Sequence, residues 1–172
     1  GHYKIYLSFF TVDDQNAKIP LAEPFIVDGI WVQTKDSAAV TDSGPIGDWL
    51  WAMDDEAELA GYENDNTGAK FELESKIVCQ GTHSVAVIPD GKAIETKLAL
   101  DLEGERLQRW IGQNEVIMNI YLPPENEFNP TMFFLGMADL SSGWEWVGGV
   151  FADVDPVLGW NLSSQSTTCA GE

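Results

Sequence analysis

The chain has 172 residues, with 28 acidic and 9 basic side chains and a formal net charge of −19. Its length fits one domain spanning residues 1–172, which can bury a sizeable core without needing a metal or a disulfide. The negative charge repels phosphate backbones and anionic lipids, and no apolar run is long enough to cross a bilayer, so neither nucleic acid nor a membrane is an expected partner.

The first third of the sequence predicts two strands and a long loop. HYKIYLSFFTV (residues 2–12) and EPFIVDGIWVQT (residues 23–34) are rich in the aromatic and branched side chains that favour strands. Asp28 lies inside the second apolar run and needs a partner, because an unpaired buried charge costs several kcal/mol. The small, polar, glycine and proline residues from 35 to 48 predict a loop or linker.

The rest of the chain alternates short strand patterns with turn signals. Residues 49–68 open with a short apolar run and then become acidic, with one or two helical turns expected in DDEAELAGY. Residues 105–110 fit either a helix or the start of a strand. Further strands are predicted at residues 69–78, 83–89, 93–102, 114–124, 130–140, 144–154 and 157–164. About ten strands without a sustained helical pattern predict an all-β sandwich.

The seven tryptophans are the clearest functional signal. In SSGWEWVGG, Trp144 and Trp146 are two residues apart, so in a strand they point to the same face, and the small residues around them leave the indoles uncovered. Flat indole faces can stack on sugar rings, because both surfaces are apolar. The alternative is that one of the pair packs inward through a bulge. Trp160 is a weaker candidate for the same platform, whereas Trp31 and Trp51 are predicted to lie in the core.

No nucleophile motif, zinc-binding pattern, phosphate-binding loop or dinucleotide fingerprint is present in the sequence. A pair of carboxylates placed for glycoside cleavage stays an alternative, although 28 acidic residues make some close pair inevitable by chance. Arg109, Trp110 and Asn119 could supply contacts to a ligand, and the competing interpretation is that they are solvated surface.

Cys79 and Cys169 are the two cysteines of the chain. A disulfide between them would remove about 4 kcal/mol of unfolded-state entropy. A bridge is favoured over two free thiols, because the polar C-terminal tail has little else to hold it. With two histidines and no CxxC pattern, a zinc site is not expected.

Three parts of the sequence resemble a known family. NEVIMNIYLPP followed by MFFLGMADLSSGWEWVGG is similar to the central strands of β-jelly-roll carbohydrate-binding modules, most closely the mannan-binding family 27 modules of bacterial β-mannanases. GTHSVAVIPDG resembles another strand of that superfamily, and YKIYLSFFTV with PFIVDGIWV resembles its closing pair of strands.

The order of these parts differs from the family. The closing pair lies at the C-terminus of those modules, but here it occupies the N-terminal part of the chain. The resemblance therefore implies a circularly permuted jelly roll, in which residues 34–48 join the usual termini. The rival interpretation is strand exchange between tandem modules.

The resemblance also implies a structural calcium ion near the junction of the first and last strands. Asp28 would be one ligand, and an acid of the MDDE segment would be another, Asp54 as first choice and Glu56 as second. Hard carboxylate oxygens suit Ca²⁺, and a bound cation would explain a buried Asp28.

The family's binding cleft is implied to use about three aromatic side chains. Trp144 matches the exposed tryptophan of the family, and Tyr62 falls near a second aromatic position. The third position has no aromatic counterpart in this sequence, so Trp146, Trp110 or Trp160 would replace it.

What the resemblance implies is a secreted, non-catalytic carbohydrate-binding module. It would bind β-1,4-mannan, manno-oligosaccharides or related β-glycans and hold an attached glycoside hydrolase on the polysaccharide. Two other classes remain open from the sequence: a jelly-roll polysaccharide lyase or glycosidase, and a structural or adhesive β-sandwich whose tryptophans lie mostly in the core.

Overall fold

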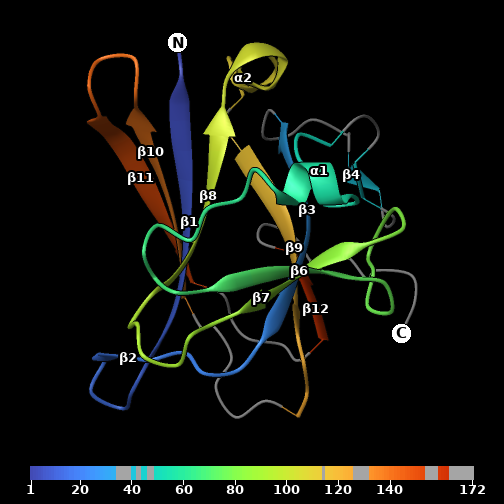
Figure 1. Cartoon of the computed structure of the whole chain (residues 1–172), viewed down its shortest axis with the longest axis vertical. Coiled ribbons are helices and arrows are strands. Elements are labelled where there is room, and N and C mark those ends of the chain that lie inside the picture. Colours follow the sequence, from blue (N-terminus) through green and yellow to red (C-terminus); the bar gives the residue numbers. More distant parts are fainter. Residues whose placement is uncertain are drawn as a thin grey trace.

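The computed structural model describes residues 1–33, 40–41, 44–45, 49–113, 115–125, 132–153 and 159–162. Within them the chain forms two large antiparallel sheets, a two-stranded ribbon and two short helices (Figure 1). The predicted all-β sandwich is confirmed. The helices are α1 (Glu56–Leu59) and α2 (Gly104–Trp110), and in the described part of the chain no helix has the length and apolar character needed to cross a membrane.

The first sheet is built around one central strand. Its members are β1 (Tyr3–Val12), β2 (Lys18–Ile19), β8 (Thr96–Leu102), β10 (Met132–Asp139) and β11 (Glu145–Asp153). β1 pairs with β10 on one side and β8 on the other, β11 pairs with β10, and β2 pairs with the end of β1. Beyond β8, Glu63 forms a single bridge with Ala99. The order across the sheet is therefore β11, β10, β1, β8 and then the segment around Glu63.

The second sheet packs against the first. In order across the sheet, its members are β12 (Gly159–Leu162), β9 (Glu115–Leu122), β3 (Phe25–Gln33), β7 (Ser84–Ile88) and β6 (Lys70–Glu74). Of the predicted loop at residues 34–48, the structure describes a ribbon of β4 (Val40–Thr41) and β5 (Gly44–Pro45). The circular permutation stays a prediction.

The structure shows which secondary structure residues 49–68 and 105–110 adopt. The apolar run that begins at Trp49 does not form a full strand, because only Trp51 forms a bridge, with Ile30. DDEAELAGY contains the predicted helical turn as α1, whose first turn is capped by the Asp55 side chain accepting from the backbone N–H of Glu58. The ambiguous segment at residues 105–110 is helical, as part of α2.

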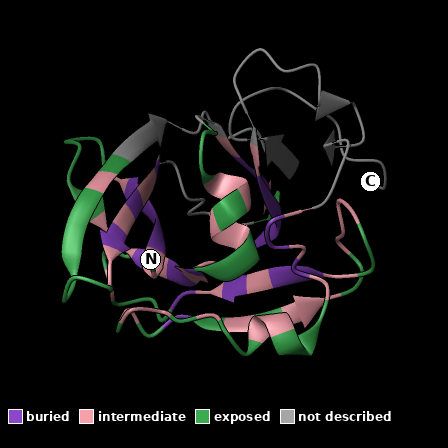
Figure 2. Cartoon of the chain, turned by 90° about the horizontal axis from the view of Figure 1, so that it is seen from above, coloured by how far each residue is buried: buried purple, intermediate pink, exposed green. Residues whose placement is uncertain are grey.

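The hydrophobic core lies between the two sheets (Figure 2). β1 shows the alternation on which this core depends, because Ile5, Leu7 and Phe9 are buried within it, whereas Tyr6 belongs to a separate small cluster on the opposite face. The Phe9 ring lies 4.8 Å from that of Phe25 in the opposing sheet, measured between centroids. Such ring contacts join the two layers.

Cys79 lies between β6 and β7 and is disulfide-bonded. This agrees with the preference for a bridge over two free thiols. Cys169, the other cysteine of the sequence, lies outside the described residues.

We expect Phe9→Ala to destabilise the protein by about 3 to 5 kcal/mol, because the fully buried ring contacts both sheets and its removal leaves a cavity. Urea unfolding followed by circular dichroism measures this loss. Ile94→Ala is the matched control, since Ile94 is exposed and its truncation should change stability by no more than about 0.5 kcal/mol. Equal losses in the two variants would contradict the assigned core.

Candidate functional site

The turn between β10 and β11 positions the first of the two neighbouring tryptophans. Asp139 organises this turn, because its Oδ1 accepts a hydrogen bond from the Ser141 backbone N–H at 2.8 Å and its Oδ2 accepts one from the Ser142 hydroxyl at 3.3 Å. Gly143 and Trp144 follow with φ angles of +87° and +66°. A non-glycine residue in this left-handed region costs on the order of 1 to 3 kcal/mol, so the surroundings must hold Trp144 in place.

Four rings gather on the outer side of the first sheet, away from the core. We call the group of Tyr6, Phe134, Trp144 and Trp146 the aromatic face. Trp146 is central, with its ring centroid 5.9 Å from Phe134 at an interplanar angle of 12°, and 6.2 Å from both Tyr6 and Trp144. The Trp144 indole N–H donates a hydrogen bond of 3.1 Å to the Tyr6 hydroxyl. Trp144 and Trp146 nevertheless remain 56% and 45% exposed, so both indoles are fixed and still accessible.

A glycine beneath the rings sets the position of Trp146. A Cβ atom at Gly136 would lie only 2.3 Å from the Trp146 ring, so the indole occupies space that any other residue would fill. Gly136 pairs with Tyr6 on one side and with Gly149 of β11 on the other. The ring therefore lies low over the strands, on β11, which forms an edge of the described sheet.

Charged side chains lie on the same face, farther across the sheet. The pairing register aligns Trp146 with Ala138, Ala138 with Lys4 and Lys4 with Asp101, so one row of neighbours crosses four strands. The Lys4 ammonium lies 2.7 Å from a Glu63 carboxylate oxygen and 3.5 Å from one of Asp101. Burial lowers the pKa of Lys4, but its bond to Glu63 and the charge of Asp101 outweigh that effect, and the pKa is raised.

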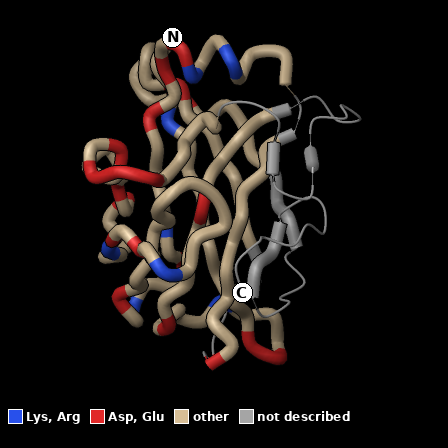
Figure 3. The backbone as a smooth tube through the Cα atoms, turned by 90° about the vertical axis from the view of Figure 1, so that its right-hand side faces the viewer, with Lys and Arg blue, Asp and Glu red and all other residues tan. Residues whose placement is uncertain are grey.

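Acidic side chains are spread over many loops of the molecule (Figure 3), and several of the few basic ones are paired with them. On the same face as Lys4, the Lys97 ammonium lies 2.8 Å from an Asp65 oxygen. Exposed pairs of this kind add little stability. They do present hydrogen-bond donors and acceptors side by side next to the aromatic face.

The structure brings together only two of the predicted binding residues, Trp144 and Trp146. Tyr62 adjoins β8 and packs against the core, with β10, β1 and β8 between it and β11. Trp110 also packs partly against the core. The Arg109 guanidinium donates a hydrogen bond to the backbone carbonyl of Trp49.

The other two predicted binding residues belong to the second sheet. Asn119 of β9 is buried, so it is not on an exposed cleft. Trp160 lies in β12, and its side chain falls outside the described residues. Trp31 and Trp51 are buried in the interior, as predicted.

Sequence reasoning missed Tyr6 and Phe134 as members of the site. The alternation in β1 does place Tyr6 opposite Ile5 and Leu7, which is a signal that it faces outward. The sequence contains no comparable signal that β1 and β11 flank the same strand, so the meeting of Tyr6 with the tryptophans could not be inferred.

Asp28 in β3 is fully buried, and only one of its two carboxylate oxygens is satisfied. Oδ2 accepts hydrogen bonds from the backbone N–H groups of Cys79 at 2.6 Å and Gln80 at 2.9 Å, whereas Oδ1 has no partner among the described residues. Burial raises the pKa of Asp28 to about 7, although the hydrogen bonds from Gln80 and Cys79 lower it. An unpartnered interior carboxylate oxygen is costly, and a bound cation would remove that cost.

The Asp54 carboxylate is bound by the same loop between β6 and β7 that binds Asp28. Its Oδ1 accepts hydrogen bonds from the backbone N–H groups of Thr82 at 2.8 Å and His83 at 2.9 Å. The loop at residues 79–83 therefore donates to both carboxylates, and the negative charge of Asp54 contributes to the raised pKa of Asp28. Repulsion between them also favours a cation at this position.

Asn119 is a third polar residue beside Asp28. It pairs with Asp28 across β3 and β9, and its Nδ2 is buried with no partner in the described structure. Exchanging the amide oxygen and nitrogen would present an oxygen at that position instead. Glu56, the second choice from the sequence, is an exposed residue in the first turn of α1. The described residues hold no group of three or more His, Cys, Asp and Glu side chains suited to a metal.

We expect Gly136→Ala to displace the Trp146 ring while the fold is retained, at a cost of about 1 to 3 kcal/mol, because the new Cβ overlaps the indole. Acrylamide quenching of tryptophan fluorescence reports the displacement, and urea unfolding reports the cost. Gly61→Ala is the control, since the site at Gly61 has room for a Cβ. Unchanged quenching in Gly136→Ala would contradict the position of Trp146.

Function has to be inferred from the fold and from these two clusters. No known family model matches this sequence, and no match was found among curated proteins or solved structures. The likeness to mannan-binding modules therefore rests on the sequence motifs alone.

Proposed function

We propose that the protein is a non-catalytic carbohydrate-binding module that recognises β-1,4-mannan or a related β-glycan on the aromatic face. The observation that supports this most directly is the pair of fixed, half-exposed indoles on the outside of a sheet. Two large exposed aromatic side chains that make no contribution to the core are an unfavourable surface for a soluble protein unless something docks on them.

The geometry of the indoles suits a glycan chain. Their ring planes differ by 38° with centroids 6.2 Å apart, so consecutive sugar rings of a twisted chain could each lie on one indole. The apolar C–H face of a pyranose would cover the exposed ring surface, as apolar burial requires. The hydrogen bond from Trp144 to Tyr6 holds the first indole before the ligand arrives, which lowers the entropy lost on binding.

The charged pairs beside the aromatic face would then select hydroxyl orientation. Lys4 offers N–H donors, and Glu63 and Asp101 offer acceptors, within reach of one another. A hydroxyl group both donates and accepts, so it can bridge such a pair without leaving either charge unpaired. A neutral glycan therefore suits this face better than an anionic one.

Modest affinity follows from this arrangement. Two stacked rings and a few solvent-compensated hydrogen bonds of about 1 kcal/mol each correspond to dissociation constants of roughly micromolar to tens of micromolar. Such affinity suits a module that holds an attached glycoside hydrolase near polysaccharide. β-Mannan as the preferred glycan, the attached hydrolase and an extracellular location rest on the family resemblance.

We also propose that Asp28, Asp54 and Asn119 hold a structural Ca²⁺ ion. Asp28 contributes an otherwise unpartnered oxygen, and the loop that follows Ile77 wraps both carboxylates. A cation there would neutralise two like charges and fix this loop between the second sheet and the segment before α1.

Trp146→Ala and Trp144→Ala should each fold normally and weaken the binding of mannohexaose at least tenfold, about 1.4 kcal/mol, because each removes a stacking surface. Calorimetric titration with mannohexaose and cellohexaose measures the affinity and the preference. Val147→Ala is the matched control, since Val147 is 52% exposed in the same strand and outside the ring cluster. Wild-type affinity in both tryptophan variants would exclude the aromatic face as the site.

Calcium should stabilise the protein relative to chelator, by about 2.7 kcal/mol at a concentration one hundred times the dissociation constant. Asp28→Asn should remove this stabilisation and make the chelated protein more stable than wild type, because it replaces a buried carboxylate by a neutral amide. Differential scanning calorimetry in calcium and in EDTA measures both effects. Glu56→Gln serves as the control, and the same melting temperature of wild type in both buffers would refute the calcium site.

A further inference from the structure

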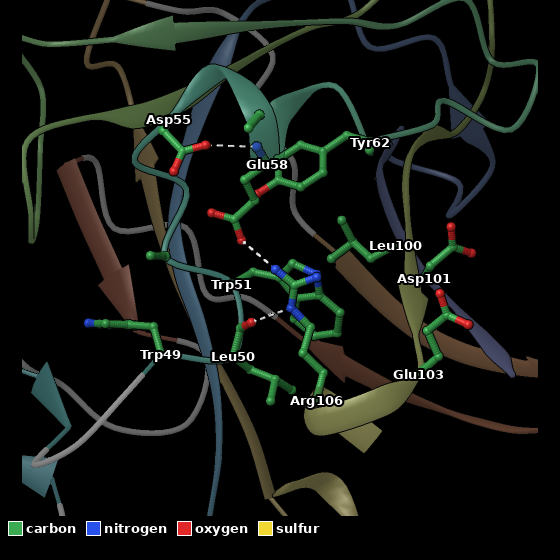
Figure 4. Close-up of a pocket in the computed structure, with 13 residues that line it drawn as sticks. Trp49, Leu50, Trp51, Asp55, Glu58, Tyr62, Leu100, Asp101, Glu103 and Arg106 are labelled. Atoms are coloured by element: carbon green, nitrogen blue, oxygen red, sulfur yellow. Dashed lines mark hydrogen bonds and ion pairs between the residues drawn. The ribbon is translucent and has the colours of Figure 1, made fainter. Parts of the chain in front are cut away.

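A second candidate site lies on the other side of β8 from the aromatic face. A cavity of about 590 Å³ opens between the segment from Trp49 to Ala52, the helix α1 and its following turn, the end of β8 and the start of α2 (Figure 4). Its volume lies in the range typical of small-ligand sites. None of the exposed indoles of the aromatic face lines it.

Arg106 is held across this cavity by contacts with its lining. Its Nε donates to the Leu50 carbonyl at 2.8 Å, its Nη2 lies 3.4 Å from a Glu58 oxygen, and the guanidinium stacks over the Trp51 ring at 5.3 Å. These contacts fix the guanidinium but use only part of its fork of N–H donors. The remaining donors have no partner among the described residues.

Tyr62 places a second polar group beside Glu58. Figure 4 shows its ring reaching toward Glu58, and its buried hydroxyl contacts that side chain without reaching the geometry of a full hydrogen bond to any described residue. Burial, with the negative charge of Glu58, raises the pKa of this hydroxyl, so it stays protonated at neutral pH. An unsatisfied buried hydroxyl is costly, and a ligand that reaches it would recover that cost.

The charges of the lining restrict the ligand. Asp55, Glu58, Asp101 and Glu103 surround the single guanidinium of Arg106. The excess of carboxylates disfavours an anion. Part of the charge is already balanced within the protein, because Glu58 lies beside Arg106, and Asp101 lies beside His2 and Lys4. Hydroxyl groups can accept from Arg106 and donate to a carboxylate at the same time, so a neutral polyhydroxyl ligand suits both.

Glu58 is an acceptor within the protein rather than an available acid. Its Oε2 accepts from the Met53 backbone N–H at 2.8 Å, and its other oxygen faces Arg106. These contacts tie Glu58 to the turn before α1. Both carboxylate oxygens of Glu58 therefore already face protein donors.

We propose that this cavity is a second carbohydrate site that takes one neutral hexose unit, separate from the aromatic face. Tyr62 and Arg106 would donate to its hydroxyls, and Asp55 or Glu103 would accept from them. The proposal goes beyond the function suggested above, because it needs neither exposed tryptophan. The hexose could be a free sugar or a unit of a longer chain. Asp101 lies three strand spacings, roughly 14 Å, from Trp146 along one row of the sheet.

The test is a titration of ¹⁵N-labelled protein followed by NMR. The probes are mannose, glucose and galactose, with glucosamine and glucuronate as charged comparisons, and mannohexaose as the chain. The backbone amides of Ala57, Gly61 and Tyr62 report the cavity, and the indole N–H groups of Trp144 and Trp146 report the aromatic face.

Matched variants assign any response to the cavity. Ala57→Trp should fill the cavity and abolish binding there, whereas Ala60→Trp, on the same helical turn but outside the lining, should not. Tyr62→Phe should weaken binding roughly fivefold with little loss of thermal stability, because the hydroxyl contacts Glu58 without the geometry of a full hydrogen bond. Tyr3→Phe is the control for that substitution.

We expect saturable shifts of the cavity amides with at least one neutral hexose, and none in Ala57→Trp. Shifts with monosaccharide indicate a free sugar, whereas shifts with mannohexaose alone, shared with the indoles at one affinity, indicate a chain unit. Shifts of the indoles without the cavity amides would overturn this proposal and leave the aromatic face intact. Shifts of the cavity amides without shifts of the indoles would support this proposal and overturn the aromatic face as a binding site. A response to glucosamine but to no neutral hexose would also overturn it.

Discussion

The alternation of side chains along β1 is the constraint on which both faces of the first sheet depend. Ile5, Leu7 and Phe9 fill the space between the sheets, so Lys4 and Tyr6 must point outward. Because β1 is hydrogen-bonded on both sides over most of its length, a shift of one residue would exchange these sets and place a lysine in the core. The hydrophobic core therefore fixes where the outward rings and charges lie.

The aromatic face is held by the same register. Tyr6 faces Gly136, and the missing side chain at Gly136 gives Trp146 room to lie low over the sheet. Trp144 occupies a left-handed backbone conformation, and its hydrogen bond to Tyr6 and contact with Trp146 help to offset that strain. A site with its rings already in position binds with less loss of entropy, which is why rigid strands rather than loops suit recognition of a flat, weakly polar ligand.

Electrostatics favours neutral ligands at several places on this acidic molecule. Lys4, Lys97 and Arg106 each lie beside carboxylates, so the basic groups near the two candidate sites are partly neutralised before any ligand binds. The buried Asp28 and the partly exposed Asp54 are different, because no basic side chain lies among the described hydrogen-bond partners of their carboxylates. A small divalent cation is the kind of partner that satisfies two such oxygens, whereas polyhydroxyl ligands satisfy the paired charges at the surface.

The sequence by itself determined the class of fold, because period-two alternation and turn residues act over a few residues. It also identified Trp144 and Trp146 as candidates for one exposed face, with a bulge that turns one of them inward as the alternative, and it identified Asp28 as a buried charge in need of a partner. Only the tertiary structure decided that Tyr6 and Phe134 join the tryptophans, that β10, β1 and β8 lie between Tyr62 and β11, and that Asn119 is buried beside Asp28. These relations depend on which distant strands pair, and in a sandwich that choice is made by the packing of the whole core rather than by any local pattern.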